Sequence, residues 1–387
     1  MKFNKFALSE LATIKYGKNQ KKVLSESGNV PIYGTGGLMG YATTALYDEP
    51  SVLIGRKGTI GKVKYVEHPF WTVDTLFYTI VNTDIVLPKY LYYIMSLIDL
   101  NNYNEGTTIP SLRTETLNRL EFDIPDLEEQ RKILSCLNPI DEKIELNNAI
   151  NNNLLEQIKT ICTAWLSEYK PFDGVMPSDW VETPLSDIAE FISGYSYKGT
   201  ELTDSTIAMA TIKNFDRKGG FKLDGYKEII PSSKLKESQH AELFDTLVAH
   251  TDLTQNAEVI GNAELVMSKS GYDDIVFSMD LVKVLPKKDG VSKFLIAAIL
   301  QDKKFKAHCL GYVNGTTVLH LSKKALPEYK LLLPSDFSTL KPLDEVVTAL
   351  YKQVSSNISE NTYLEELRES LLPKLMSGEL DVSNIDL

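Results

Sequence analysis

A glycine-rich, cationic run is the strongest candidate in this sequence for binding chemistry. The run GRKGTIGK at 55–62 sets Arg56, Lys57 and Lys62 among glycines. Glycine lets a backbone approach a phosphate closely, and arginine can donate two hydrogen bonds to guanine. The run VPIYGTGG at 30–37 adds aromatic and hydroxyl groups. These residue types in this pattern predict a surface that contacts nucleic acid.

Polar runs of the same kind occur in the second half of the chain. IKNFDRKGG at 212–220 carries cations and an amide, and HTDLTQN at 250–256 carries imidazole, hydroxyl and amide groups. The triplet Gly-Thr-Thr occurs at 106–108 and again at 315–317, either as a shared feature of the fold or as part of the contact surface. An ordinary polar turn is the alternative interpretation of each run. The side chains predicted to contact DNA are Tyr33, Thr35, Arg56, Lys57, Thr59, Lys62, Thr107, Thr108, Arg113, Lys213, Asn214, Arg217, Lys218, Thr251, Gln255, Asn256, Thr316 and Thr317.

Several familiar catalytic patterns fail on inspection. In GTGGLMG at 34–40, Met39 stands where a dinucleotide-binding loop needs its third glycine. Between Gly55 and Gly61 there are five residues, where a P-loop has four, and Val63 replaces the magnesium-binding Ser or Thr. The histidines show no H-E-x-x-H spacing, and no G-x-S-x-G elbow occurs. We therefore predict no catalytic residue and no metal site in this chain.

The charge distribution matters because a net charge of −11 is unusual for a protein that binds DNA. Residues 1–125 carry 13 Lys and Arg against 12 Asp and Glu, and residues 183–334 carry 19 of each. The acidic excess lies in residues 126–182 and 335–387, which are each −6. The two larger segments can therefore each hold a basic face, while the acidic segments are either solvated helices or surfaces for partners.

The cellular compartment is constrained by what the sequence lacks. No apolar run reaches the roughly 18 residues that span a membrane, and the first residues lack the apolar region of a signal peptide. Cys136, Cys162 and Cys309 lie far apart, so no disulfide framework is indicated. We expect a cytoplasmic protein that does not associate with membranes.

The chain contains an internal repeat. LSELATIKYG at 8–17 matches LSDIAEFISG at 185–194, and GTTIPSLRTETLNRLEFDIP at 106–125 matches GTTVLHLSKKALPEYKLLLP at 315–334. The matches lie at the domain edges, and the interiors differ. The order is domain, helix, domain, helix. The predicted boundaries are 1–125 for the first domain, 126–182 for the first helical spacer, 183–334 for the second domain and 335–387 for the second spacer.

The domains are predicted to be β-rich and mixed, each a curved sheet with a few helices. Strands are indicated by short β-branched and aromatic runs. They are SVLIG (51–55), KVKYV (62–66), TLFYTIV (75–81), DTLVAH (245–250), AELVMS (263–268) and DLVKVLP (280–286). Helical periodicity appears at 89–98 and 292–300.

The spacer segments carry apolar stripes with coiled-coil spacing. The first runs from Ile133 to Trp165 and the second from Leu343 to Leu375, with corresponding positions offset by 210. Both stripes are interrupted at the centre by two asparagines: Asn147 and Asn151 in the first, Asn357 and Asn361 in the second.

Antiparallel packing of the two helices would bring these centres together. Asn147 and Asn151 would then face Asn361 and Asn357. Buried asparagines fix register, because a slipped register leaves the amides unpaired in apolar surroundings. The alternative is that these asparagines lie on a solvated face.

Proline is expected to interrupt both spacers. Pro139 predicts a short helix near 127–137, followed by a longer one that begins with Asn138 as its cap and runs to about residue 169. That helix would be roughly 46 Å long, which is of the order of one turn of B-DNA, near 34–36 Å. Pro373 is expected to limit the second helix.

These residues together resemble the specificity (S) subunit of type I restriction–modification systems, over nearly the whole chain. The resemblance rests on PIYGTGG, SVLIGRKGTIGKV, HPFWTVDTLFYTI, IPDLEEQRKIL, PSDWVETPLSDIAEFISG and LLPKLMSGEL, in this order and with the duplication. The middle of the second domain departs from the family pattern, so the site residues there are less well supported.

The resemblance implies an α+β fold with two target-recognition domains separated by two long antiparallel helices that form a coiled coil. Each domain would read half of a split, asymmetric sequence in double-stranded DNA. Two methyltransferase subunits, which bind S-adenosylmethionine and methylate adenine, would dock on the helices. Restriction subunits that use ATP and Mg²⁺ could join them. The specificity subunit itself would be non-catalytic and bind no cofactor.

Two other readings compete with this one. A two-domain scaffold could bind proteins through an acidic coiled coil, although cationic glycine-rich loops in both domains favour DNA. A standalone methyltransferase or nuclease is opposed by the missing motifs.

Overall fold

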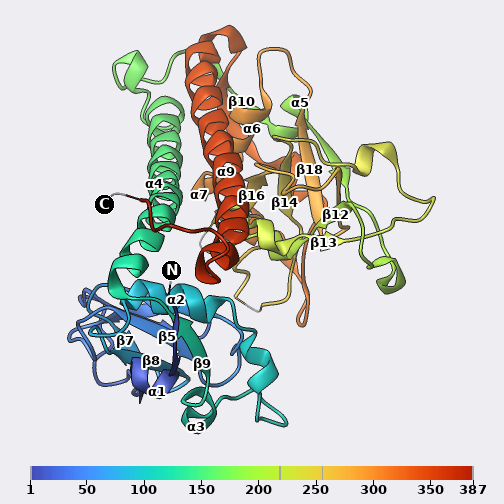
Figure 1. Ribbon diagram of the computed structural model, residues 1–387. Helices are drawn as coiled ribbons and strands as arrows, with labels where there is room; N and C mark the ends of the chain where they lie inside the picture. Colours follow the sequence, from blue (N-terminus) through green and yellow to red (C-terminus); the bar gives the residue numbers. More distant parts are fainter. Residues whose placement is uncertain (1, 218, 255, 386–387) are drawn as a thin grey trace. The chain divides into compact units, whose positions relative to one another are not determined.

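The computed structural model describes residues 2–217, 219–254 and 256–385. The fold is α+β, as predicted, with β-rich domains and two long helices, α4 (Leu127–Leu166) and α9 (Lys341–Met376). Two compact units divide the chain: residues 1–142 with 364–387, and residues 143–363. Both long helices run through this division, so each unit holds one β-rich domain and parts of both helices (Figure 1).

The first domain consists of short strands and three short helices. Its strands are β1 (Asn4–Ala7), β2 (Ala12–Tyr16), β3 (Val30–Gly34), β4 (Gly37–Ala42), β5 (Ser51–Gly55), β6 (Val63–Val66), β7 (Trp71–Thr72), β8 (Leu76–Val81) and β9 (Glu121–Ile124). Its helices are α1 (Leu8–Leu11), α2 (Pro88–Ser96) and α3 (Thr114–Leu117).

The second domain has more elements and longer connections. Its strands are β10 (Trp180–Pro184), β11 (Ala189–Ser193), β12 (Ile207–Ala210), β13 (Lys227–Glu228), β14 (Thr246–Ala249), β15 (Thr251–Asp252), β16 (Ala263–Leu265), β17 (Asp274–Phe277), β18 (Leu281–Pro286), β19 (Val313–Asn314), β20 (Leu319–Leu321) and β21 (Lys330–Pro334). Its helices are α5 (Leu185–Ile188), α6 (Lys293–Leu300), α7 (Lys303–Leu310) and α8 (Ala325–Glu328).

The two domains share one sheet topology. The first has a four-stranded sheet in the order β2-β8-β5-β6 and a three-stranded sheet in the order β4-β3-β7. The second repeats these as β11-β18-β14-β16 and β13-β12-β17. In β4-β3-β7 and in β13-β12-β17, one pairing is antiparallel and the other parallel. The terminal pairs β1–β9 and β10–β21 also correspond. The prediction of one curved sheet per domain was therefore wrong, because the strands of each domain divide among several separate sheets.

The predicted elements lie close to the observed ones. SVLIG forms β5, whose five residues are all buried, and the apolar segment at 292–300 forms α6, of which seven residues are buried. Ser292 caps α6 by accepting the Leu295 amide at 3.1 Å. A helix this apolar on every side is stable only inside a core. The run at 263–268 gives a shorter strand than expected, β16, although its residues are buried.

Helix α4 is continuous from Leu127 to Leu166, so the predicted break at Pro139 is wrong. Leu137 and Ile140, on either side of the proline, are both buried, and this packing outweighs the local cost of a missing N–H, about 3 kcal/mol. Asn138 is not a cap, since its buried amide oxygen has no partner among the described residues. Forty residues give roughly 60 Å, longer than the predicted 46 Å. Helix α9 likewise continues through Pro373 to Met376.

The asparagine layers are paired as the stripes predict. Asn147 donates to Asn361 at 2.9 Å, and Asn357 donates to Asn151 at 2.8 Å. Residue numbers rise along α4 while they fall along α9, so the helices are antiparallel (Figure 1). All four asparagines are buried. The alternative of a solvated face is therefore wrong, and a register shift would separate these amides from their partners.

Candidate nucleic-acid interface

The cationic loop of the first domain leaves the buried end of β5. A Cβ on Gly55 would collide with the Thr59 carbonyl, and Gly58 has φ +85°, so both glycines are required by the backbone. The Arg56 amide donates to the Thr75 carbonyl at 2.9 Å. These contacts fix the backbone where the loop leaves β5.

The same loop is tied to the Gly-Thr-Thr loop. The Gly58 amide donates to the Pro110 carbonyl at 2.9 Å, and the Leu112 amide donates to the Arg56 carbonyl at 3.0 Å. Thr107 and Thr108 are exposed. The structure therefore brings two of the three predicted contact segments of this domain together.

The side chains of this loop are mostly available to a ligand. Lys57, Thr59 and Lys62 are exposed. The Arg56 guanidinium lies 5.0 Å from the centre of the Tyr16 ring and donates to the Asp74 carbonyl at 2.8 Å. Arginine held in this way keeps other N–H groups free to donate, and its orientation is fixed in advance.

Thr35 lies beside the cationic loop, and Arg113 follows the Gly-Thr-Thr loop along the chain. The Thr35 hydroxyl is 4.0 Å from the position that a Cβ on Gly58 would take, so the β3–β4 turn reaches the cationic loop. Arg113 is exposed, and its Nε lies 3.1 Å from Glu105 Oε2. Thr35, Arg56 and Lys57 thus form the centre of a polar surface, which we call the first loop surface together with Thr59, Lys62, Thr107 and Thr108.

Tyr33 is part of the core. Its side chain is 7% exposed, its hydroxyl contacts His68 Nε2 at 3.3 Å, and Lys64 Nζ lies 4.2 Å from the ring centre. Burial raises the pKa of its hydroxyl, with a smaller contribution from Tyr41. Tyr33 therefore leaves the proposed contact set, because it presents little surface to a ligand.

In the second domain, the loop that follows β14 is held by the same kind of backbone contacts as the cationic loop of the first domain. The His250 amide donates to the Asp280 carbonyl at 2.8 Å, and the Leu321 amide donates to the His250 carbonyl at 2.9 Å. His250 is therefore the structural counterpart of Arg56. The runs at 55–62 and 250–256, which look unlike each other in sequence, follow equivalent strands.

The Gly-Thr-Thr loops have a common structural cause. A Cβ on Gly106 would collide with the Ile109 carbonyl, and a Cβ on Gly315 would collide with the Val318 carbonyl. The repeated glycine is thus a feature of the fold. Thr316 and Thr317 are exposed at the place that Thr107 and Thr108 take in the first domain.

Hydrogen bonds to a buried carboxylate shape the second loop. Asp252 accepts the amides of Thr254 at 2.7 Å, Val259 at 2.7 Å and Ile260 at 3.3 Å. Burial acts to raise the pKa of Asp252, but these hydrogen bonds outweigh it and hold the pKa below its usual value. Asn256, at the outer part of this loop, is exposed.

The run at 212–220 lies against this loop. Arg217 Nε is 3.1 Å from Glu258 Oε2, and the Asn262 side-chain amide (Nδ2) donates to the Asp216 carbonyl at 3.4 Å. Lys213 and Arg217 are exposed. We call Lys213, Arg217, His250, Asn256, Thr316 and Thr317 the second loop surface.

Two predicted residues of this domain are structural. Asn214 is fully buried, accepts from the Thr211 amide at 2.8 Å and donates to the Lys222 carbonyl at 2.7 Å. Thr251 is 6% exposed and donates to Asp280 at 3.0 Å. Their polar groups are used inside the protein, so both leave the contact set. Lys218 and Gln255 lie outside the described residues.

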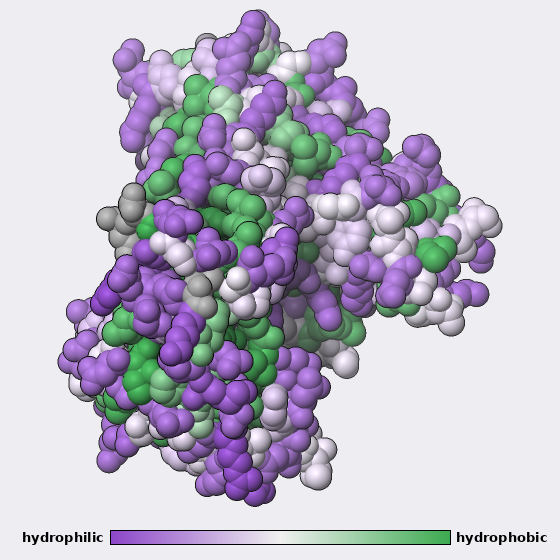
Figure 2. Space-filling view, in the orientation of Figure 1, coloured by the Kyte–Doolittle hydropathy of each residue, from purple (hydrophilic) through white to green (hydrophobic). Residues whose placement is uncertain are grey.

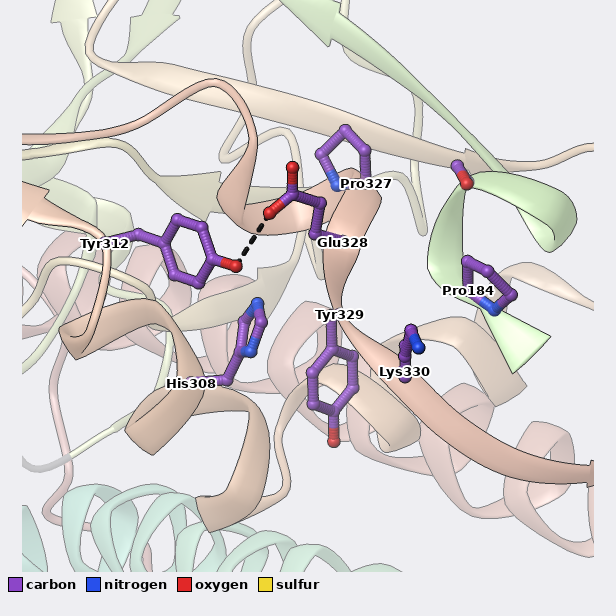
Figure 3. A pocket seen from close by; sticks show the side chains of 8 residues that line it. Pro184, His308, Tyr312, Pro327, Glu328, Tyr329 and Lys330 are labelled. Carbon is purple, nitrogen blue, oxygen red and sulfur yellow. Dashed lines mark hydrogen bonds between the residues drawn. The ribbon is translucent and has the colours of Figure 1, made fainter. Parts of the chain in front are cut away.

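A separate pocket of the second domain lies between α7, α8 and the start of β21 (Figure 3). Tyr312 donates to Glu328 at 2.7 Å across it, and the His308 ring is 4.8 Å from the Tyr312 ring and 5.1 Å from the Tyr329 ring. Lys330 pairs with Glu182 at 2.7 Å. The side chains of Tyr312, Glu328, His308 and Lys330 already have protein partners, so we do not propose this pocket as a DNA contact.

Two searches of the described part of the chain bear on other kinds of site. No group of three or more His, Cys, Asp or Glu side chains there could hold a metal ion. Among the helices of residues 2–217, 219–254 and 256–385, none is long and apolar enough to cross a membrane.

Comparisons with known proteins agree with the resemblance drawn from the sequence. Residues 1–156 match the family model described as type I restriction modification DNA specificity domain. The chain is 23% identical over 368 residues to the type I restriction enzyme MjaIX specificity subunit of Methanocaldococcus jannaschii, covering 88% of this chain and 80% of that protein. It is 24% identical over 445 residues to the HindI specificity subunit of Haemophilus influenzae, covering 97% of this chain and 92% of that protein.

A solved structure shares the fold. The type I restriction–modification S subunit from M. genitalium aligns with a TM-score of 0.55 at 17% identity, covering 97% of this chain and 96% of that chain. The predicted resemblance to type I restriction–modification specificity subunits is thereby confirmed.

Proposed function

We propose that this chain, as a type I specificity subunit, reads a split, asymmetric DNA sequence, one half with each loop surface. The observation that carries the proposal is the equivalence of the two loops. Arg56 and His250 are held by matching backbone contacts, yet their side chains differ in kind. Two loops with the same backbone arrangement but different side chains can recognise two half-sites of different sequence.

Both loop surfaces have the chemistry that this role requires. The first offers three cations and several hydroxyls, and the second offers Lys213, Arg217, an imidazole and an exposed amide. Cations position phosphates, and amides, imidazoles and guanidinium groups can recognise base edges. The net charge of −11 does not oppose this, because its excess lies in the helical spacers and partner subunits can supply further phosphate contacts.

The long helices are the proposed docking surface for two methyltransferase subunits, and restriction subunits could join them. On α4, Leu146 is 54% exposed and Ile150 is 38% exposed, and on α9 Tyr363 is 63% exposed. Apolar surface is visible among hydrophilic residues over the long helices in Figure 2. Exposed apolar side chains within acidic helices suit a protein partner better than solvent alone. The antiparallel helices would set the distance between half-sites.

Catalysis is assigned to the partners. The methyltransferase subunits would bind S-adenosylmethionine and methylate adenine, and restriction subunits would use ATP and Mg²⁺. This chain would bind no cofactor and would contribute target recognition. The proposed location is the cytoplasm, where these partners and DNA meet.

The test is a methylation map with one altered residue. The chain is produced with its methyltransferase, and methylated adenines are located in the host genome. Unaltered protein should give a two-part motif with a fixed gap. Arg56→Ala should relax one part only, because losing a bidentate contact costs about 1–3 kcal/mol of discrimination at its base pair.

Arg119→Ala is the matched control, since Arg119 is an exposed arginine of the same domain outside the loop surface. It should leave the motif unchanged. A scaffold without DNA recognition would give the same methylation pattern for every variant, and relaxation of both parts by Arg56→Ala would also contradict the proposal.

A further inference from the structure

Two histidines occupy the positions in the second domain that correspond to Arg56 and Ser111 in the first. His250 takes the place of Arg56, as its backbone contacts show. Lys57 pairs with Ser111 in an antiparallel bridge, and Thr251 pairs with His320 at the same point of the second domain. His320 is therefore the counterpart of Ser111. One imidazole is half-buried and the other is exposed.

Three charged or titratable groups lie near His250. His320 on β20 and Lys323 just after it lie near enough to oppose its protonation, while Asp280 before β18 favours it. Asp280 itself is engaged by the Thr251 hydroxyl at 3.0 Å and the Ser278 hydroxyl at 3.4 Å. Burial is the main cause that lowers the pKa of His250, and the interactions with His320 and Lys323 add to it.

The contrast with Arg56 is chemical. Arginine is always charged and only donates hydrogen bonds, whereas a neutral imidazole donates from one nitrogen and accepts at the other. Protonation turns the second nitrogen into a donor and adds a charge. Each of the two imidazoles thus has two recognition states, whereas the arginine has one.

We propose that His250 and His320 are specificity-determining residues of the second domain and contact its half of the DNA target at the position that Arg56 and Ser111 hold in the first. This inference rests on the proposed function and extends it to named residues. The half-site that the second domain reads should present acceptors, such as guanine N7 and O6 or phosphate oxygens, which bind the protonated imidazoles more strongly.

The sign of the resulting pH dependence follows from linkage. If DNA binds the protonated form better, binding raises the imidazole pKa and takes up protons. Affinity for the second half-site should then increase as pH falls from 8 to 6, by up to about tenfold per pH unit for each proton taken up. The contribution of Arg56 to the affinity for the first half-site should stay constant from pH 8 to 6, since arginine does not titrate in this range.

The experiment uses the chain assembled with its methyltransferase and fluorescent duplexes that carry the mapped target. Dissociation constants are measured at constant ionic strength from pH 6 to 8. Three duplexes are compared: the complete target, one with the first half randomised and one with the second half randomised. His250→Ala and His320→Ala should each lower discrimination at the second half about 5- to 100-fold and reduce the pH slope.

Reciprocal exchange separates recognition from folding. His250→Arg should bind with little pH dependence at the second half, and Arg56→His should introduce a pH slope at the first half. His68→Ala is the control, because His68 is an exposed histidine of the first domain outside both loop surfaces. Thermal melting of each complex checks that the variants are folded.

The outcomes distinguish this inference from the proposed function. If the unaltered complex discriminates both halves but His250→Ala and His320→Ala keep its discrimination and pH slope, the inference is wrong and the proposed function stands. If the unaltered complex discriminates neither half, the proposed function itself is wrong. A pH slope that follows His68→Ala instead would also overturn the inference.

Discussion

The same place in the two domains is stabilised by neutral groups in one and by ions in the other. At the start of β5, Ser51 is buried and donates to the Thr79 carbonyl at 2.7 Å. Gly55 and Ala249 are equivalent residues at the ends of β5 and β14. The counterpart of Ser51, four residues earlier, is therefore Asp245, which directly precedes β14 and is 2% exposed. Asp245 lies 3.4 Å from Lys283 Nζ and 2.5 Å from Lys293 Nζ.

This difference shows that the same strand topology can hold either a neutral or a charged side chain at an equivalent buried position. A hydroxyl needs only hydrogen-bond partners, whereas a buried carboxylate needs a compensating charge. Once one ion is buried, its partners must be kept. The second domain has therefore become dependent on a group of charges that the first does without.

The largest effect is expected from breaking this ion group. Asp245→Asn should lower the free energy of unfolding of the second unit by about 3–5 kcal/mol, because Lys283, which is 7% exposed, keeps its charge without its carboxylate. Ser51→Ala in the first domain should cost only about 1–2 kcal/mol, the loss of a buried hydrogen bond. Hydrogen exchange of the amides in β14 and β5 reports on each strand separately.

If Asp245→Asn and Ser51→Ala lowered the free energy of unfolding equally, the prediction would be wrong, since the ion group would then contribute no more than a neutral hydrogen bond. Lys341→Ala is a suitable control, because its ammonium lies at the surface, 3.9 Å from Glu345.

A second buried carboxylate, Glu264, predicts that the stability of the second domain depends on pH. Glu264 on β16 is the counterpart of Lys64 on β6, since each pairs with the equivalent residue of the neighbouring strand. Lys64 is exposed, while Glu264 is 8% exposed, accepts the Gly220 amide at 2.7 Å, and has its pKa raised to about 7 by burial.

The folded protein therefore holds a proton on Glu264 that the unfolded chain releases near pH 4.5. Its contribution to stability is present below that pH and is lost as pH rises toward about 7. Glu264→Gln should remove this loss, so the variant should gain stability relative to the unaltered chain by up to about 1.4 kcal/mol per pH unit between pH 5 and 7. A constant difference between the two proteins across this range, measured by urea unfolding, would show that Glu264 does not titrate there.

Much of the frame could be predicted from the sequence because local pattern and packing agree in it. The apolar stripes predicted two helices that pack on each other and, for an antiparallel arrangement, the facing of Asn147 with Asn361, because the asparagines lie at the centre of both stripes. The strands β5, β8 and β18 were likewise found from β-branched runs. Pro139 was misjudged because tertiary packing on both sides of it outweighs its local preference.

The candidate sites could be predicted only in part. Arg56 and Lys57 stand out because glycines surround them, but the burial of Tyr33 and Asn214 depends on strands far away in the sequence. The equivalence of Arg56 with His250 has no signal in the local residues, because the connecting loops differ in length and composition. It became visible only through the backbone contacts that both share.

Photo-crosslinking tests most directly the claim that each loop surface contacts its own half of the DNA. A benzophenone amino acid is placed at Lys57 or at Asn256, exposed positions in the two equivalent loops, and the complex with its methyltransferase is irradiated on a duplex carrying the mapped target. The account predicts that the adducts fall in different halves, one for each position. Adducts from both positions in the same half, or no adducts from either, would contradict it.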